Sequence, residues 1–332
     1  MTRLNTKYLG LPLRSPIVVS ACTLSENIDN ILRMEDAGAG AVVMFSMFEE
    51  QIRKEVAKMA SIMRSTTNVF AEASDFFPDL DEYHVATANY LETIRLAKER
   101  VHIPIIGSLN GITPQGWIDY ARQLEQAGAD ALEVNIFYIP ADIRLSSREV
   151  EERYLDIIRL VRKTVKIPIA AKMNPYFSAM GYMAQQMQDA GADGLVLFNR
   201  FYQPDYDILQ LKVLHDLAYS EATEIRLPLL WIAILSGQIK SSLAATTGVQ
   251  SAREVIKYLL AGADVTMTAS ALYKNGISYI STMERVLLQW MDSMGFQTLD
   301  YFKGSMNQSN ISDPTAYQRA NYIRILEGAK QS

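Results

Sequence analysis

One short phrase recurs four times along the chain and constrains its fold more than any other feature. Each copy reads Ala-Gly-Ala followed by Gly or Asp, and then continues into an apolar run of strand length. The copies are AGAGAVVMFS at 37–46, AGADALEVNI at 127–136, AGADGLVLFN at 190–199 and AGADVTMTAS at 261–270. The glycine suits the left-handed conformation that commonly ends a helix, so each copy predicts a helix end followed by a buried strand.

A second phrase alternates with the first and places proline at the start of an apolar run. Its copies are SPIVVSA at 15–21, IPIIGSL at 103–109 and IPIAAKM at 167–173, and KSSLAAT at 240–246 supplies one further strand. These runs are apolar on both faces, as strands of a buried parallel sheet must be. The eight predicted strands begin near Pro16, Gly40, Ile103, Ala131, Ile167, Gly194, Lys240 and Asp264. Most gaps between them hold one helix-period segment, which predicts the right-handed crossovers of a (β/α)8 TIM barrel.

The 332 residues are predicted to form a single TIM-barrel domain of the α/β class. Such barrels take about 250 residues, which leaves about 80 for additions. We expect the barrel core over about 15–292, an insertion between strands 2 and 3 over about 47–102, and a C-terminal helical extension over about 295–332. The insertion is expected to hold an extra element over the mouth of the barrel.

Charge and cysteine content narrow the function. The chain has 32 Lys plus Arg against 37 Asp plus Glu, so its net charge of −5 does not draw it to nucleic acid or to an anionic membrane. Its single cysteine, Cys22, excludes an internal disulfide and an iron–sulfur cluster held by four thiolates of this chain. The start lacks the apolar core of a signal peptide, and the longest apolar run elsewhere, 227–235, is too short to span a bilayer. We therefore expect a cytoplasmic protein that acts on a small molecule.

Chemistry in TIM barrels lies at the carboxyl ends of the strands, and Lys172 is the most informative residue there. A lysine inside an apolar strand loses hydration and needs an anionic partner, so it indicates either a ligand site or a structural ion pair. Asn135 and Asn199 end the two neighbouring strands, where amides can bind a planar heterocycle through donors and acceptors together. None of the histidines falls at a strand end, which argues against a histidine general base and a His-rich metal site.

A phosphate site is predicted where strands 7 and 8 end. The turn at 246–249 precedes a capped helix, and the segment at 269–271 follows strand 8. Backbone N–H groups at these places commonly bind phosphate in barrels, although an ordinary turn between strand and helix is the alternative. Cys22, at the end of strand 1, is more often a packing residue than a nucleophile.

Five segments resemble, in order and in approximate spacing, those of the dihydroorotate dehydrogenase family, including the pyrimidine-reducing barrel of dihydropyrimidine dehydrogenase. They are TKYLGLPLRSPIVVSACT, LEVNI, IPIAAKMNPYF, ADGLVLFNR and LLAGADVTMTASALYKNG, and the resemblance covers about residues 5–292. It implies a TIM barrel that binds FMN, in a family where homodimers are common.

The resemblance also implies roles for the residues at the strand ends. Lys172 matches the lysine beside the pyrimidine ring of the flavin, where a positive charge favours the anionic reduced form. Asn135 and Asn199 match asparagines that contact the flavin and a pyrimidine substrate. The residues that match the first-strand segment against the isoalloxazine are Ser20, Ala21, Cys22 and Thr23, and those that match the backbone cradle of the flavin phosphate are Gly248, Ala269 and Ser270.

The chain departs from the family pattern mainly on the substrate side. Where the family has Asn-Leu-Ser-Cys-Pro-Asn, this chain has NIFYIP, so Tyr138 stands at the catalytic cysteine and Pro140 at the second asparagine. Phe45 stands where the family has a lysine that contacts the flavin. A tyrosine with an ordinary pKa of about 10 is a poor base at neutral pH. Ser146, in the same loop, would replace it only if the loop folds back.

These departures predict a less polar substrate pocket covered by two loops, one after strand 4 and one around 73–79. The side chains expected to line this lid are Phe76, Phe77, Phe137, Tyr138 and Ile139. Arg200 and Arg144 are the nearby candidates to bind an acidic substrate.

The sequence therefore predicts an FMN-dependent oxidoreductase that acts on the CH–CH group of a dihydropyrimidine-like or other small planar substrate and passes electrons to a separate acceptor. Little oxidation of dihydroorotate is expected. The catalytic candidates are Tyr138, Lys172 and Ser146, and the candidate substrate contacts are Asn135, Asn199 and Arg200. Two alternatives stay open: a catalytically silent flavin-binding barrel, and a flavin-free lyase or aldolase that forms a Schiff base at Lys172.

Overall fold

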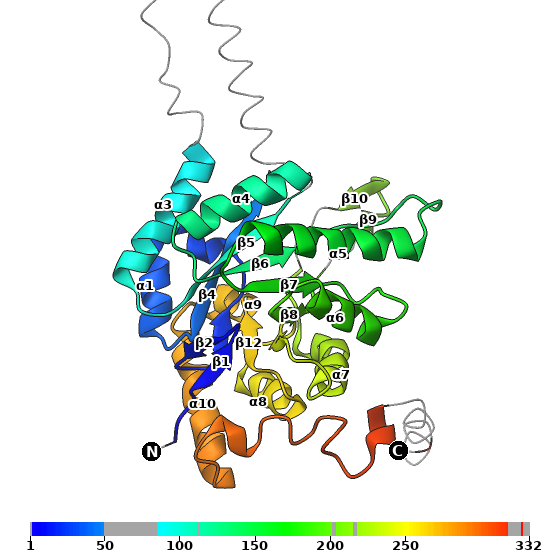
Figure 1. Ribbon diagram of the computed structural model, residues 1–332. Helices are drawn as coiled ribbons and strands as arrows, with labels where there is room; N and C mark the ends of the chain where they lie inside the picture. Colours follow the sequence, from blue (N-terminus) through cyan, green and yellow to red (C-terminus); the bar gives the residue numbers. More distant parts are fainter. Residues whose placement is uncertain are drawn as a thin grey trace, which may run out of the picture.

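Eight parallel strands form a closed barrel, which confirms the predicted TIM-barrel fold (Figure 1). The computed structural model describes residues 2–49, 85–111, 113–200, 204–214, 218–317 and 327. Around the barrel the strands are β3 (Ile17–Val19), β4 (Ala41–Phe48), β5 (Ile105–Asn110), β6 (Ala131–Asn135), β7 (Ile169–Met173), β8 (Gly194–Leu197), β11 (Ser242–Ala245) and β12 (Val265–Thr268). Each begins within two residues of its predicted start.

Helices surround the barrel on its outer side (Figure 1). They are α1 (Ile28–Asp36), α3 (Val85–Arg100), α4 (Pro114–Gln126), α5 (Ser147–Thr164), α6 (Met180–Asp189), α7 (Arg226–Leu235), α8 (Ala252–Ala261), α9 (Ser270–Asn275) and α10 (Tyr279–Met294). Short 3-10 turns lie at η1 (Thr23–Glu26), η3 (Ala222–Ile225), η4 (Leu299–Tyr301) and η5 (Pro314–Tyr317). The main apolar core fills the layer between the helices and the strands.

The Ala-Gly-Ala repeat ends a helix and leads into a buried strand, as the sequence predicts. The glycine in each copy has a positive φ, between 96° and 111°, directly before a buried strand. These residues are Gly38, Gly128, Gly191 and Gly262. A residue with a Cβ rarely adopts this conformation, so the glycines let the chain leave each helix and turn at once into the barrel.

A hairpin near the start of the chain, which was not predicted from the sequence, closes the amino-terminal end of the barrel. Its strands are β1 (Thr6–Tyr8) and β2 (Leu11–Leu13). The Leu9 N–H donates to Ser242 Oγ at the start of β11, and Thr6 Oγ1 donates to the backbone oxygen of Asp264 just before β12. Tyr8 and Leu9 pack inside the barrel. Because this end is filled by protein, the carboxyl ends of the strands are left to hold ligands.

The additions to the barrel differ in part from expectation. Part of the predicted insertion, 85–100, is α3, the outer helix between β4 and β5, and the expected lid residues around 73–79 lie outside the described residues. Over 295–317 the chain forms the turns η4 and η5, and the rest of the expected helical extension, apart from residue 327, lies outside the described residues. Gly295 and Gly304 have positive φ there, and Phe296 and Phe302 pack with Trp290 of α10. A further hairpin, β9 (Asp205–Asp207) with β10 (Lys212–Leu214), follows β8.

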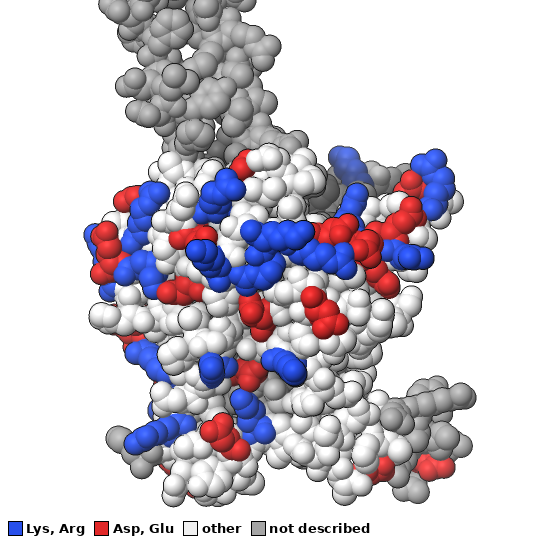
Figure 2. Space-filling model, in the orientation of Figure 1, with Lys and Arg blue, Asp and Glu red and all other residues white. Residues whose placement is uncertain are grey.

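The surface agrees with the small net charge. Figure 2 shows basic and acidic side chains interspersed on one face of the molecule. Among the described residues, no helix combines the length and the apolar character that crossing a membrane requires.

Candidate active site

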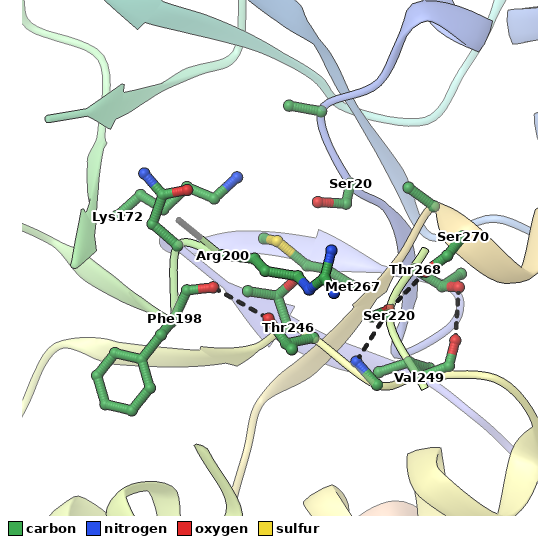
Figure 3. Close-up of a pocket in the computed structure, with 15 residues that line it drawn as sticks. Ser20, Lys172, Phe198, Arg200, Ser220, Thr246, Val249, Met267, Thr268 and Ser270 are labelled. Carbon is green, nitrogen blue, oxygen red and sulfur yellow. Dashed lines mark hydrogen bonds between the residues drawn. The ribbon is translucent and has the colours of Figure 1, made fainter. Parts of the chain in front are cut away.

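A pocket lies at the carboxyl ends of the strands, where a TIM barrel carries its chemistry (Figure 3). It has a volume of about 180 Å³ and is open to solvent. Its lining comes from the ends of β3, β7, β8, β11 and β12 and from the segment before η3. The lining residues are Ser20, Ala21, Lys172, Phe198, Asn199, Arg200, Ser220, Thr246, Thr247, Gly248, Val249, Met267, Thr268, Ala269 and Ser270.

Lys172 forms a buried ion pair at one side of this pocket. Its Nζ lies 3.0 Å from Oε1 of Glu133, whose side chain is 0% exposed, while the Lys172 side chain is 10% exposed. Glu133 Oε2 has no hydrogen-bond partner among the described residues. The sequence predicts an anionic partner for Lys172, and the structure identifies this partner as Glu133. The signal was present, because Glu133 lies two positions before Asn135 and therefore faces the same side of its strand.

The buried carboxylate also acts on the hydroxyl of Tyr8. Burial is the main reason why the pKa of Tyr8 lies well above its usual value, and the negative charges of Glu133 and Asp264 raise it further. The Tyr8 hydroxyl, like Glu133 Oε2, lacks a hydrogen-bond partner among the described residues. The interior of the barrel thus holds Lys172 as the cation that compensates Glu133.

The predicted polar group on β6, β7 and β8 is assembled in the structure. Asn135 lies opposite Lys172 in the register of β6 and β7, and the Nδ2 of Asn199 donates to Oδ1 of Asn135 at 2.6 Å. All three side chains are buried. Lys172 and Asn199 line the pocket, whereas Asn135 is hydrogen-bonded to Asn199 and does not line it. An ammonium group and an amide at one edge of a pocket can bind the acceptors and donors of a planar heterocycle.

The other side of the pocket is formed by the turn that follows β11 (Figure 3). Thr247 and Gly248 both have positive φ, 78° and 75°. A Cβ on Gly248 would lie 2.6 Å from Cγ2 of Ile225 and 2.8 Å from the backbone oxygen of Glu221, so the close approach requires glycine. A β-branched residue with positive φ, such as Thr247, is strained, and such strain concentrates at functional sites.

Two serine hydroxyls complete this side of the pocket, and one of them was not predicted from the sequence. Ser220 Oγ lies 2.6 Å from Ser270 Oγ and accepts a hydrogen bond of 3.4 Å from the Gly248 N–H. Ser270 was predicted here, whereas Ser220 lies in the long connection after β8, where no motif marks it. The predicted residue Ala269 also lines the pocket.

The end of strand β3 is divided between the pocket and its rim. Ser20 and Ala21 line the pocket, as predicted. Thr23 instead binds the side chain of Tyr273, since its hydroxyl lies 2.6 Å from the Tyr273 hydroxyl. Burial raises the pKa of the Cys22 thiol, while hydrogen bonds from its surroundings and the charge of Lys172 lower it. Cys22 is partly buried and packs against the apolar core, in agreement with the preferred interpretation of the sequence.

Tyr138 and Ser146, the two other predicted catalytic residues, do not line this pocket. The Tyr138 ring lies under the guanidinium of Arg153 on α5, with 4.4 Å between the guanidinium carbon and the ring centroid. It lines a separate cavity of about 500 Å³ beside α4 and α5. Ser146 is the N-cap of α5 and forms a capping box with Glu149. Ser146 thus has a structural role at the helix end.

The two candidate arginines differ in position. Arg200 lines the pocket, but its Nε lies 2.9 Å from Oε2 of Glu224, so its charge already has a partner. Arg144 lies in the exposed loop and pairs with Asp142 at 2.8 Å.

Phe45, at the position of the family's second lysine, packs edge-on against Tyr90 with 4.7 Å between the ring centroids. Among the described residues, Lys172 and Arg200 are therefore the basic side chains that line the pocket.

The chemistry of the pocket fits a flavin mononucleotide. One side offers an ammonium group and the amide of Asn199 for a heterocycle, and the other offers a strained turn, a required glycine and two hydroxyls for a phosphate. In the described part of the chain, no group of three or more His, Cys, Asp or Glu side chains is placed to hold a metal ion.

Comparison with known proteins identifies the family of the chain. The family model of dihydroorotate dehydrogenase matches residues 3–291. The chain is 25% identical over 280 residues to the catalytic subunit of dihydroorotate dehydrogenase B (NAD(+)) from Methanocaldococcus jannaschii, covering 82% of this chain and 88% of the relative. The subunit of the same name from Thermoplasma volcanium is 25% identical over 311 residues, covering 92% of this chain and 98% of the relative. The one from Shouchella clausii is 25% identical over 318 residues, covering 93% of this chain and 100% of the relative. The chain belongs to the dihydroorotate dehydrogenase family.

Proposed function

We propose that the protein is an FMN-dependent oxidoreductase whose substrate is a small planar molecule with a CH–CH bond to oxidise. The observation that carries this proposal is the buried group of Lys172, Asn135 and Asn199 beside a pocket whose far side suits a phosphate. When bound, FMN would supply the two-electron acceptor for the hydride of a C–H bond.

Each side of the pocket has a separate task under this proposal. Lys172 would favour the reduced flavin, because an ammonium stabilises the negative charge that forms on reduction. Asn135 and Asn199 would orient the flavin and the substrate through their amides. Gly248 and Ser270 would hold the phosphate.

We expect purified protein to be yellow and to release FMN on denaturation. Lys172→Ala should lower the reduction potential of the bound flavin or weaken its binding, because the cation beside it is lost. The visible spectrum, mass analysis of the released cofactor and a redox titration check these results. Lys7→Ala, which removes an exposed lysine from β1 at the opposite end of the barrel, is the control for net charge. A colourless protein that takes up no FMN on titration would refute the proposal.

Dihydroorotate is not the substrate that we propose. Proton removal next to the hydride requires a placed base, and the position of the family's cysteine holds Tyr138, which lies under Arg153. Ser146 is engaged at the start of α5. Among the predicted catalytic residues, Lys172 is the one that lines the pocket, and it donates to Glu133.

We expect dihydroorotate oxidation to be slower than in family members with a base by about 10²–10⁴, the usual contribution of general-base catalysis. Steady-state assays with fumarate, a quinone and NAD as acceptors measure it. Tyr138→Phe should change any residual turnover by less than about twofold, since its hydroxyl lies outside the pocket. Turnover at the level of established family members that is lost in Tyr138→Phe would show that the tyrosine acts as the base.

We also propose a separate electron acceptor and a homodimer. Relatives of this chain are named as catalytic subunits, which supports an acceptor that this chain does not contain. Light scattering of the purified protein tests the homodimer, and a monomer at micromolar concentration would exclude it.

The Schiff-base alternative is disfavoured by the ion pair. Lys172 donates to a fully buried carboxylate, and a nucleophilic lysine has to be present as the free amine. Borohydride treatment with carbonyl substrates should therefore leave Lys172 unmodified.

A further inference from the structure

The ion pair of Lys172 and Glu133 connects the pocket with the interior of the barrel. Lys172 lines the pocket (Figure 3), whereas Glu133 does not line it and its side chain is fully buried. The Lys172 Nζ donates to Glu133 Oε1 at 3.0 Å, and Glu133 Oε2 has no hydrogen-bond partner among the described residues. The positive end of the pair therefore lies at the pocket, and the negative end lies inside the protein.

The groups around Glu133 inside the barrel do not compensate its charge. In the register of the strands, Glu133 lies between Ser108 on β5 and Ala170 on β7, and neither residue carries a charge. The hydroxyl of Tyr8 is protonated at neutral pH, because burial raises the pKa of Tyr8 well above its usual value. Among the described residues, Lys172 is thus the cation that compensates Glu133.

Each charge of the pair acts on side chains around it. Burial is the main reason why the pKa values of Tyr8 and Tyr90 are raised, and the negative charge of Glu133 raises both further. On the pocket side, burial raises the pKa of the Cys22 thiol, and the charge of Lys172 is among the influences that lower it. A negative charge that forms in the pocket is therefore attracted by Lys172 and repelled by Glu133, which lies behind it.

We infer that Glu133 is a positioning residue that holds the Lys172 ammonium at the edge of the pocket and offsets part of its charge, so that the pocket stabilises a reduced flavin less than a lysine alone would. This inference rests on the proposed flavin function and adds a residue that does not line the pocket. Hydride transfer from the substrate delivers two electrons and one proton, so it adds one negative charge at the pocket. The carboxylate behind Lys172 weakens the attraction for that charge and keeps the reduction potential lower.

The first test is a redox titration of protein loaded with FMN. Glu133→Gln keeps a hydrogen-bond acceptor for Lys172 but removes the negative charge, so we expect the reduction potential to rise. A tenfold gain in the affinity for reduced over oxidised flavin corresponds to about 30 mV for two electrons, and we expect at least about this shift. Glu133→Asp, which keeps the charge, should shift the potential less. Glu99→Gln, which removes the same charge from the exposed face of α3, is the control and should leave the potential unchanged.

The second test needs no flavin. Acylation of lysine side chains in protein freed of cofactor, followed by mass analysis of the peptides, reports how firmly Lys172 is held. We expect Lys172 to react about fivefold faster in Glu133→Gln, because a hydrogen bond between two charged groups is replaced by a weaker one to a neutral amide. Lys303, whose Nζ lies 3.0 Å from Oδ1 of Asp264, is the internal control and should react at the same rate in both proteins.

The outcomes separate this inference from the proposed function. A potential that falls or stays unchanged in Glu133→Gln would overturn the role of Glu133 and leave the flavin proposal intact. An equal rise in Glu133→Asp or in Glu99→Gln would overturn it as well, since the effect would not follow the charge at this position. If the unmodified protein binds no flavin, the proposed function fails. In that case, faster acylation of Lys172 in Glu133→Gln still supports Glu133 as the residue that holds Lys172, and an unchanged rate refutes it.

Discussion

Replacing Lys172 by methionine should destabilise the cofactor-free protein by about 3–5 kcal/mol, the usual result of removing one partner of a buried ion pair. Glu133 would be left inside the barrel with neither oxygen paired, because Lys172 is its one hydrogen-bond donor among the described residues. Glu133→Gln should be milder, since the Lys172 ammonium lies at the pocket and is reached by solvent. Denaturant unfolding of both variants measures how much more stability Lys172→Met loses than Glu133→Gln.

A double variant and a pH series separate this effect from general damage to the core. Lys172→Met combined with Glu133→Gln should recover much of the lost stability, because no unpaired charge remains. In Lys172→Met alone, Glu133 would take up a proton on folding and release it on unfolding. The stability of that variant should therefore fall as the pH rises above about 4.3, by up to about 1.4 kcal/mol per pH unit. Destabilisation that is independent of pH and unchanged in the double variant would contradict the ion-pair explanation.

Replacing Gly40 by alanine should destabilise the protein by about 3 kcal/mol or more, at the upper end of overpacking effects. A Cβ on Gly40 would lie 2.0 Å from the backbone oxygen of Ser15 and 3.0 Å from its carbonyl carbon. No rotamer change relieves a clash with the main chain. The Gly40 N–H also donates to the backbone oxygen of Ile17 at 2.8 Å, so the shift would strain the contact between β3 and β4.

Gly181 provides the matched control for this substitution. It lies in α6, and a Cβ there would meet nothing within 4 Å. Gly181→Ala should stabilise the protein by about 0.5–1 kcal/mol, because alanine loses less conformational freedom than glycine in a helix. Thermal or denaturant unfolding of the two variants gives the comparison. Similar stabilities for Gly40→Ala and Gly181→Ala would show that the barrel accommodates a side chain at position 40.

The sequence by itself determined the barrel fold, because the residues that specify each helix end and each strand are neighbours in the chain. The glycine that ends a helix and the apolar run that follows it are adjacent in the chain, so each copy of the repeat specifies its helix end and strand without reference to distant residues. The same adjacency located Lys172, Asn135 and Asn199 at strand ends, since strand ends are read from the strands themselves. The segment before the first barrel strand carries no copy of the repeat, and the hairpin of β1 and β2 was therefore missed.

The tertiary structure decided which of the candidate residues meet. Glu133 and Lys172 are 39 positions apart and become partners because β6 and β7 are neighbours in the barrel. Ser220 and Ser270 contact each other only once the segments after β8 and β12 are folded together. Tyr138 was placed at the family's catalytic position by its sequence, yet its ring lies under Arg153, because a side chain's direction depends on what packs against its loop. A sequence states which groups are present along one strand, whereas charge compensation and hydrogen bonding depend on distances between strands, which closure of the barrel alone determines.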